Sequence, residues 1–135
     1  MADQQHAIDL SARATYAHWT PVTLRWCDTD ALGHINNVAI SSFVEASRVA
    51  IYYDVMHSAG VDTSKLDIVL ARVEIDFIEE LHYPGTVDVG ARFLQMGKKS
   101  LKTAYGVFVG EKCVATSVCV NVFFDLTTRR SVSPR

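Results

Sequence analysis

One long helical segment followed only by strand-like segments is the feature that most constrains the fold of this chain. The helix is predicted to begin at Asn37 or Val38 and to end near His57, before Gly60 and several polar residues. Within it, apolar side chains fall on one stripe beside small residues, which lets the helix pack closely against a sheet. One helix before a run of antiparallel strands predicts an α+β fold with the helix across one face of the sheet.

The strands are predicted from apolar residues at every second position. This alternation occurs in residues 68–78, 87–93 and 101–109, and a short strand before the helix is expected from residue 22 to residue 26. Residues 113–124 are apolar on nearly both faces, as in a central strand that is covered on each side. Because turn residues separate the later segments at hairpin-like spacing, we expect the strands after the helix to form an antiparallel meander.

The length of the chain indicates one domain. With 135 residues, of which 49% are apolar, the chain can bury a substantial core. We expect a single domain over residues 1–135, with its core at about residues 21–126. Residues 127–135 are polar and are expected to form a flexible tail.

The charge balance and the cysteines exclude several classes of protein. Lys and Arg number 13 and Asp and Glu number 15, so the net charge is −2 and no nucleic-acid partner is expected. No segment approaches the ~20 apolar residues of a membrane helix, and the N-terminus lacks the apolar region of a signal peptide. Cys27, Cys113 and Cys119 have no C-x-x-C spacing and lie in apolar segments, as reduced buried thiols do. We therefore expect a cytoplasmic protein without a membrane partner.

Two carboxylates and a turn glycine come directly before the predicted start of the helix. They are Asp28, Asp30 and Gly33, and Asn36 or Asn37 is a good N-cap for the helix that follows. The first amides of a helix have no partner within it and lie at a partial charge of about +0.5, so they can hold the oxygen of an acyl group. An acid beside such amides is a candidate catalytic centre.

The sequence around this turn resembles that of the hotdog-fold acyl-CoA thioesterases of the 4-hydroxybenzoyl-CoA thioesterase type. The shared motif is R-W-x-D-x-D-x-x-G-H-x-N-N at residues 25–37, followed by F-V-E-A-S-R at residues 43–48. The resemblance is specific over residues 25–48, and over residues 22–124 it rests on the order of the elements alone. It implies the hotdog fold, in which an antiparallel sheet wraps around one long central helix.

The resemblance implies hydrolysis of a thioester that links an aryl or medium-sized acyl group to coenzyme A or to an acyl carrier protein. Asp30 matches the active carboxylate of the family, and the main-chain amide of Asn37 matches the donor to the oxyanion. Asp28 matches a first acid that is less directly involved and that we expect near the substrate. Asp30 would either attack the carbonyl carbon to form a mixed anhydride or take a proton from water, and the sequence leaves both routes open.

Two polar residues of the motif have both a functional and a structural interpretation. His34 could contact the substrate or orient Asp30, or it could close the turn through a main-chain hydrogen bond. The side chain of Asn36 either contacts the substrate or, more simply, caps the helix.

Two sites outside the turn are candidates for substrate contacts. Glu45 either lies near the acyl pocket or forms a surface pair with Arg48, three residues later on the helix. The turn of Lys98, Lys99 and Ser100 aligns with a basic turn that several relatives direct toward the phosphates of CoA. The alternative for this turn is a solvated hairpin.

The motif does not predict a metal site. With Asp28 as the first position of a calcium-binding EF-hand loop, position five is Leu32 and position twelve is Ala39, so essential ligands are missing. A metal held by Asp28, Asp30 and His34 is formally possible, but the other histidines show no ligand spacing. We expect no metal and no cofactor, with CoA entering only as part of the substrate.

The resemblance implies a homodimer or homotetramer, because hotdog relatives form their sites between two subunits. Pairing would also remove the open backbone groups of exposed sheet edges. The alternative function is a non-catalytic acyl-CoA-binding or sensing domain that kept the pocket. A hydratase or dehydratase would need an Asp/His pair in a different motif, which the sequence lacks.

Overall fold

The computed structural model describes residues 8–61, 64 and 66–132 of the chain. Its long helix is α2 (Asn37–Ser58), and two 3₁₀ helices precede it, η1 (Arg13–Thr15) and η2 (Trp26–Asp28). The strands are β1 (His18–Thr23), β2 (Leu66–Phe77), β3 (Thr86–Met96), β4 (Ser100–Val109), β5 (Lys112–Asp125) and β6 (Arg130–Ser131). They form one antiparallel sheet in the order β1-β3-β4-β5-β2, and β6 pairs with β5.

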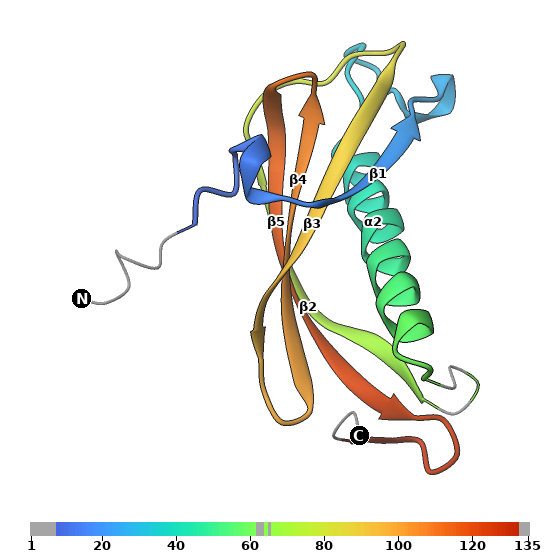
Figure 1. Ribbon diagram of the computed structural model, residues 1–135. Helices are drawn as coiled ribbons and strands as arrows, with labels where there is room; N and C mark the ends of the chain where they lie inside the picture. Colours follow the sequence, from blue (N-terminus) through green and yellow to red (C-terminus); the bar gives the residue numbers. More distant parts are fainter. Residues whose placement is uncertain (1–7, 62–63, 65, 133–135) are drawn as a thin grey trace.

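The helix α2 lies along one face of the curled sheet (Figure 1). Its apolar side, which includes Ile40, Val44 and Ile51, packs on buried strand residues such as Val89 and Val107. Burial of these side chains removes apolar area from water and holds the helix to the sheet. This is the hotdog arrangement, and the predicted extent of the helix is confirmed. In the described part of the chain, no helix combines the length and the apolar character needed to cross a bilayer.

The sheet differs from the predicted meander in the place of β2. Strands β3, β4 and β5 are consecutive neighbours, as expected, but β2 pairs with β5 and not with β3. The apolar strand β5 therefore lies between two long partners, while β3 takes β1 as its other neighbour. Residues 78–85 connect β2 to β3 by crossing over β5 and β4. Turn residues at hairpin-like spacing did not reveal this order, because they do not distinguish such a crossing from a tight hairpin.

Strand β2 is an edge strand, and its alternation does not produce a buried face. A register shift against β5 between Leu70 and Arg72 interrupts the two-residue repeat. The side chains of Val69, Val73 and Phe77 are 43%, 43% and 46% exposed. The result is a strip of apolar side chains along an open sheet edge.

The N-terminal segment packs on the face of the sheet away from α2, so the ordered core begins before the predicted boundary at residue 21. The rings of Tyr16, Trp19 and Phe108 meet edge to face, with centroids 5.6 to 6.0 Å apart. The guanidinium group of Arg13 lies 4.2 Å from the centre of the Trp19 ring, a cation–π contact. This cluster covers the outer face of β3 and β4.

The segment predicted as a tail returns to the sheet. After β5, residues 126–129 form a turn, and β6 then pairs with the end of β5. The side chain of Asp125 accepts hydrogen bonds from the amides of Thr127 and Thr128, at 2.8 and 3.2 Å, which closes the turn. Residues 133–135 of the predicted tail lie outside the described residues.

The three cysteines are free thiols, but only two of them are buried. Cys113 and Cys119 lie in β5, as predicted, and burial raises the pKa of both thiols. Cys27 is exposed in η2, so the prediction that it is a buried strand residue is wrong. The reason is that β1 ends at Thr23, whereas the strand was expected to continue to residue 26, next to Cys27.

Gly106 in β4 is predicted not to tolerate a side chain. A Cβ atom there would lie 2.6 Å from Cε1 of Phe108 and 2.8 Å from Cε2 of Tyr16. Gly106→Ala is therefore expected to lower the free energy of unfolding by about 1–3 kcal/mol, measured by urea denaturation. Gly110→Asn is the matched control, because the space around Gly110 is open and Asn tolerates its positive φ of 60°. An equal loss of unfolding free energy in both variants would contradict the packing argument.

Candidate active site

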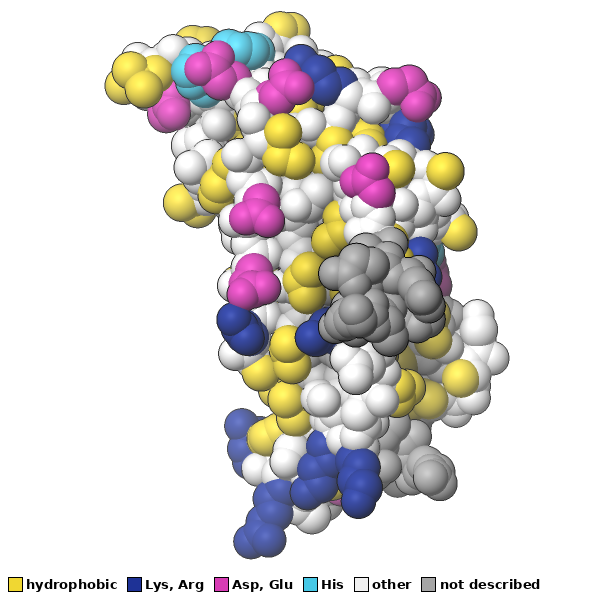
Figure 2. Space-filling view, turned by 90° about the vertical axis from the view of Figure 1, so that its left-hand side faces the viewer, with side chains coloured by type: hydrophobic (Ala, Val, Ile, Leu, Met, Phe, Trp, Pro, Cys, Tyr) yellow, Lys and Arg dark blue, Asp and Glu magenta, His cyan; other side chains and the backbone are white. Residues whose placement is uncertain are grey.

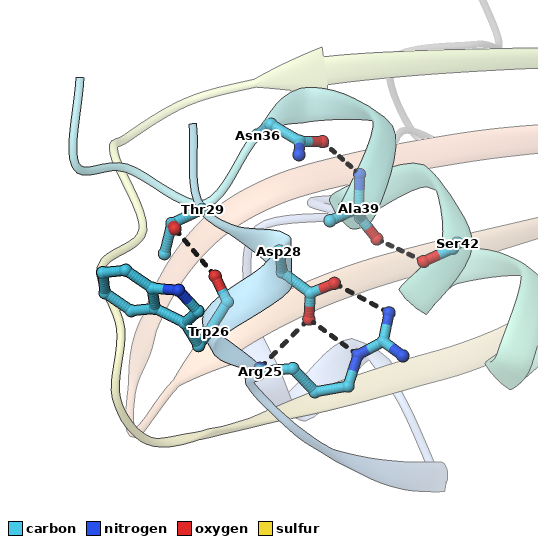
Figure 3. Close-up of polar contacts among 7 residues, drawn as sticks. All are labelled: Arg25, Trp26, Asp28, Thr29, Asn36, Ala39 and Ser42. Atoms are coloured by element: carbon cyan, nitrogen blue, oxygen red, sulfur yellow. Dashed lines mark hydrogen bonds and ion pairs between the residues drawn. The ribbon is translucent and has the colours of Figure 1, made fainter. Parts of the chain in front are cut away.

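The turn before α2 is held by an ion pair between Arg25 and Asp28 (Figure 3). Oδ1 of Asp28 lies 2.9 Å from Nη2 of Arg25, while Oδ2 accepts hydrogen bonds from the Arg25 amide at 3.1 Å and from Nε at 3.3 Å. Asp28 is 3% exposed, and hydrogen bonding to Arg25 holds the pKa of its carboxyl below the usual range. Both carboxylate oxygens of Asp28 are therefore engaged by Arg25, which braces the turn, and the contact of Asp28 with substrate stays a prediction.

Asp30 anchors the turn with one carboxylate oxygen. Its Oδ1 accepts hydrogen bonds from the main-chain amides of Leu32 at 2.9 Å and His34 at 3.1 Å. The Asp30 amide donates to the His34 carbonyl at 2.8 Å, and Gly33 adopts the left-handed φ of 85° that the turn requires. No described residue donates a hydrogen bond to Oδ2, and Asp30 is exposed. This Asx-type turn therefore fixes the direction of a carboxylate that keeps one free oxygen.

Asn36 is the N-cap of α2, as predicted for either Asn36 or Asn37. Its Oδ1 accepts a hydrogen bond from the Ala39 amide at 2.7 Å (Figure 3). Its carbonyl accepts one from the Ile40 amide at 3.2 Å. The amides of Asn37 and Val38 have no acceptor among the described residues. They are the unpaired donors at the positive end of the helix.

A cavity of about 470 Å³ joins this turn to the segment that follows β2. One wall includes Asp30, His34 and Asn37, the three residues predicted as catalytic. The second wall consists of Phe77, Ile78, Glu79, Glu80 and Leu81. The two walls are held together because the Ile35 amide donates to the Leu81 carbonyl at 2.7 Å. Sequence reasoning missed the second wall, since no local pattern places it beside the helix start.

The imidazole of His34 contacts two side chains that the sequence did not connect with it. Its Nε2 lies 3.3 Å from Oε1 of Glu80, and Nε2 of His82 lies 3.4 Å from the same oxygen. The two imidazole rings meet edge to face, with centroids 4.9 Å apart. The hydrogen bonds between His34 and Asp30 run through the main chain of His34, which agrees with the turn-closing interpretation.

Glu45 lies outside the cavity that holds Asp30. Its Oε2 is 3.5 Å from Nη2 of Arg48, so the two residues form the pair that was one of the two interpretations, with Glu45 exposed and the Arg48 side chain largely buried. Both line a separate hollow of about 260 Å³ between α2 and β2, together with Leu70 and Val73. The structure therefore does not bring Glu45 to the candidate catalytic residues.

Lys98, Lys99 and Ser100 lie at the opposite end of the molecule from Asp30. Lys98 and Lys99 lie in the β3–β4 turn and Ser100 begins β4, at the lower end of Figure 1, whereas α2 begins at the upper end. The Lys99 carbonyl accepts a hydrogen bond from the Phe123 amide at 3.0 Å, which ties the turn to β5. Figure 2 shows Lys and Arg side chains gathered at one end of the molecule and His beside acidic side chains at the other. Within one chain, the basic turn does not reach the cavity.

The chain belongs to the thioesterase-like superfamily, whose sequence profile matches residues 24–135. The match includes the turn with Asp30, the whole of α2 and the strands that follow it. Comparison with curated protein sequences finds no significant match. Membership of the superfamily supports thioester hydrolysis as the general activity.

Solved structures of other proteins share the fold. The PA5185 protein from Pseudomonas aeruginosa strain PAO1 is 25% identical with a TM-score of 0.78, over 90% of this chain and 86% of that chain. A predicted thioesterase from Bacillus stearothermophilus is 26% identical with a TM-score of 0.76, over 85% of each chain. The DHNA-CoA thioesterase from Staphylococcus aureus is 15% identical with a TM-score of 0.72, over 85% of this chain and 78% of that chain. This third likeness is one of fold alone.

The ion pair of Asp28 predicts a stability that depends on pH. A carboxyl whose pKa is lowered by folding stabilises the fold above its unfolded pKa, and this contribution is lost as the pH falls through the folded pKa. Asp28→Asn is expected to lower the midpoint of thermal unfolding by about 5 °C at pH 7. The difference from the wild type should shrink as the pH falls below about 4, as measured by calorimetry. A difference that stays constant down to the acid limit would contradict this assignment.

Proposed function

We propose that the protein is a thioesterase that hydrolyses thioesters of acyl groups with CoA or with an acyl carrier protein. The observation that carries the proposal is that a carboxylate with a free oxygen, on Asp30, shares one cavity with the unpaired amide of Asn37. Thioester hydrolysis needs these two functions, a nucleophile or base and a donor to the oxyanion. Phe77, Ile78 and Leu81 supply apolar wall for an acyl group.

In the proposed reaction, the thioester carbonyl oxygen accepts a hydrogen bond from the Asn37 amide, which polarises the carbonyl carbon. Oδ2 of Asp30 either attacks that carbon, giving a mixed anhydride that water then hydrolyses, or takes a proton from a water that attacks directly. In both routes the bond between the acyl carbon and sulfur breaks, the sulfur leaves as a thiol, and water supplies the new hydroxyl group of the acid. Oδ1 keeps its two main-chain hydrogen bonds throughout, which holds the carboxylate in place.

A second copy of the chain is proposed to complete the site. In the described part of the chain, β2 has no strand beside its outer edge, and it exposes Val69, Val73 and Phe77. Antiparallel pairing of two β2 edges would cover these side chains and satisfy the open backbone groups. A two-fold axis through the middle of β2 exchanges the two ends of the molecule. The β3–β4 turn of the partner then comes to the end of this chain that holds Asp30, where its lysines would meet the phosphates of CoA.

Asp30→Asn is expected to leave the fold intact and to remove most of the hydrolysis. An amide oxygen can still accept from the amides of Leu32 and His34, but it is a poor nucleophile and a poor base, so kcat should fall by ~10²- to 10⁴-fold. Activity is measured on a panel of acyl-CoA and acyl-carrier-protein thioesters with a thiol reagent. Asp125→Asn is the matched control, because Asp125 also accepts two main-chain hydrogen bonds in a turn, at the far end of the sheet.

Unfolding midpoints of the wild type and of both variants separate a loss of chemistry from a loss of fold. Full turnover by Asp30→Asn on the best substrate would disprove the role given to this carboxylate. If the wild type binds acyl-CoA but releases no thiol from any member of the panel, the protein is the alternative, a non-catalytic acyl-CoA-binding or sensing domain.

The role of the basic turn is tested by mixing subunits. The double variant Lys98→Ala, Lys99→Ala is expected to raise KM more than it lowers kcat, because the lysines would hold CoA and take no part in the chemistry. Suppose that Asp30 and the lysines of one site come from different chains. A hybrid dimer of one Lys98→Ala, Lys99→Ala chain and one Asp30→Asn chain then contains one intact site. Equal and random mixing should then restore about a quarter of the wild-type activity at low substrate. Hybrid dimers that form, as seen by native mass spectrometry, but recover no activity would rule out the two-chain site.

A further inference from the structure

A cluster of metal-ligating side chains lies at the wall of the cavity, and these side chains have no part in the proposed hydrolysis. It consists of His34, Glu80 and His82, whose ligand atoms all lie within 4.8 Å of one another. We infer that these three residues bind one divalent transition-metal ion of the zinc type. The site departs from the sequence-based expectation of no metal, because its ligands come from two segments that only the fold brings together.

The main chain places the two histidines side by side. His34 and His82 are directly opposed in an antiparallel bridge between the turn before α2 and the segment after β2. The hydrogen bond from the Ile35 amide to the Leu81 carbonyl, at 2.7 Å, holds the same two segments together. Directly opposed residues project their side chains to the same side, which brings the two imidazole rings into contact. The backbone therefore fixes the pair independently of any ion.

The separation of the ligand atoms suits tetrahedral coordination. Oε1 of Glu80 lies 3.3 Å from Nε2 of His34 and 3.4 Å from Nε2 of His82. Two ligands that are each about 2.0–2.1 Å from a tetrahedral zinc ion are roughly 3.4 Å from one another. Two of the three distances between ligand atoms therefore already have the required length. Small rotations of the half-exposed imidazole rings would adjust the third.

The ligand set selects the class of ion. Two imidazoles and one carboxylate suit Zn²⁺ and Co²⁺, whereas Ca²⁺ and Mg²⁺ prefer oxygen ligands throughout. Asp30 lines the same cavity, and its carboxylate adds negative charge near the site. Because Glu80 and His82 are exposed, a fourth position of the ion would be open to water.

A bound ion would connect the two walls of the cavity. His34 belongs to the turn that carries Asp30, and Glu80 and His82 belong to the segment after β2. An ion that binds the folded state alone raises stability as its free concentration exceeds Kd. The expected consequence is a rise of several degrees in the midpoint of thermal unfolding when Zn²⁺ is added.

Calorimetric titration of the untagged, chelator-treated full chain with Zn²⁺ tests the site. One ion per chain is expected, and Co²⁺ should give the visible absorption of a four-coordinate site with nitrogen and oxygen ligands. His82→Ala and Glu80→Gln should each weaken binding by at least about tenfold. His57→Ala and Glu79→Gln are the matched controls and should bind as the wild type does. His57 stacks on Tyr53 away from the cluster, and Glu79 pairs with Lys112 at 3.2 Å.

Wild-type affinity in His82→Ala, or the absence of a site with one ion per chain, would overturn the inference. The side chains of His82 and Glu80 are 58% and 64% exposed, so both variants should fold, and their unfolding midpoints in chelator check this. The outcome of the Zn²⁺ titration does not depend on the proposed hydrolysis. A chain that binds Zn²⁺ through these residues but cleaves no thioester would refute the proposed function and leave the metal site intact.

Discussion

The burial of α2 against the sheet is the constraint on which the rest of the structure depends. Its apolar side meets β3 and β4, where Val87, Val89 and Val107 are fully buried. Each such aliphatic side chain contributes roughly 1.5–3 kcal/mol when it leaves water. Because the helix is held along its length, its first turn has a fixed position. The turn before it, braced by the pair of Arg25 and Asp28, has to end at that position.

The candidate site arises where this fixed helix start meets a segment that is distant in the sequence. The chain between β2 and β3 crosses the sheet from the edge at β2, and on its way it passes the start of α2. Ile35 and Leu81 are both buried at this crossing and are joined by a main-chain hydrogen bond. This crossing therefore accounts for the cavity beside Asp30 and for the contacts of His34 with Glu80 and His82.

The single chain leaves two features that a second copy would use. Strand β2 keeps an open backbone edge with apolar side chains along it, and such an edge is a template for pairing. Charge is also unevenly placed, because Lys and Arg side chains gather at one end of the molecule, whereas His lies beside acidic side chains at the other end (Figure 2). An antiparallel pair of chains would set the basic end of one beside the acidic end of the other. Edge pairing and charge thus favour the same arrangement in the proposed dimer.

The sequence by itself determined the features that depend on near neighbours. These are the extent of α2, its cap at Asn36, the turn around Asp30 and the hairpins of β3, β4 and β5, since periodicity, capping and turn chemistry act over a few residues. The burial of Cys27 was predicted wrongly, because a local pattern does not show where a strand ends, and the sequence did not reveal that Arg25 engages both oxygens of Asp28. Only the tertiary structure decided that β2 lies beside β5 and that the segment after it completes the cavity. Those contacts depend on the path of the chain between distant segments, and burial of the whole core selects that path.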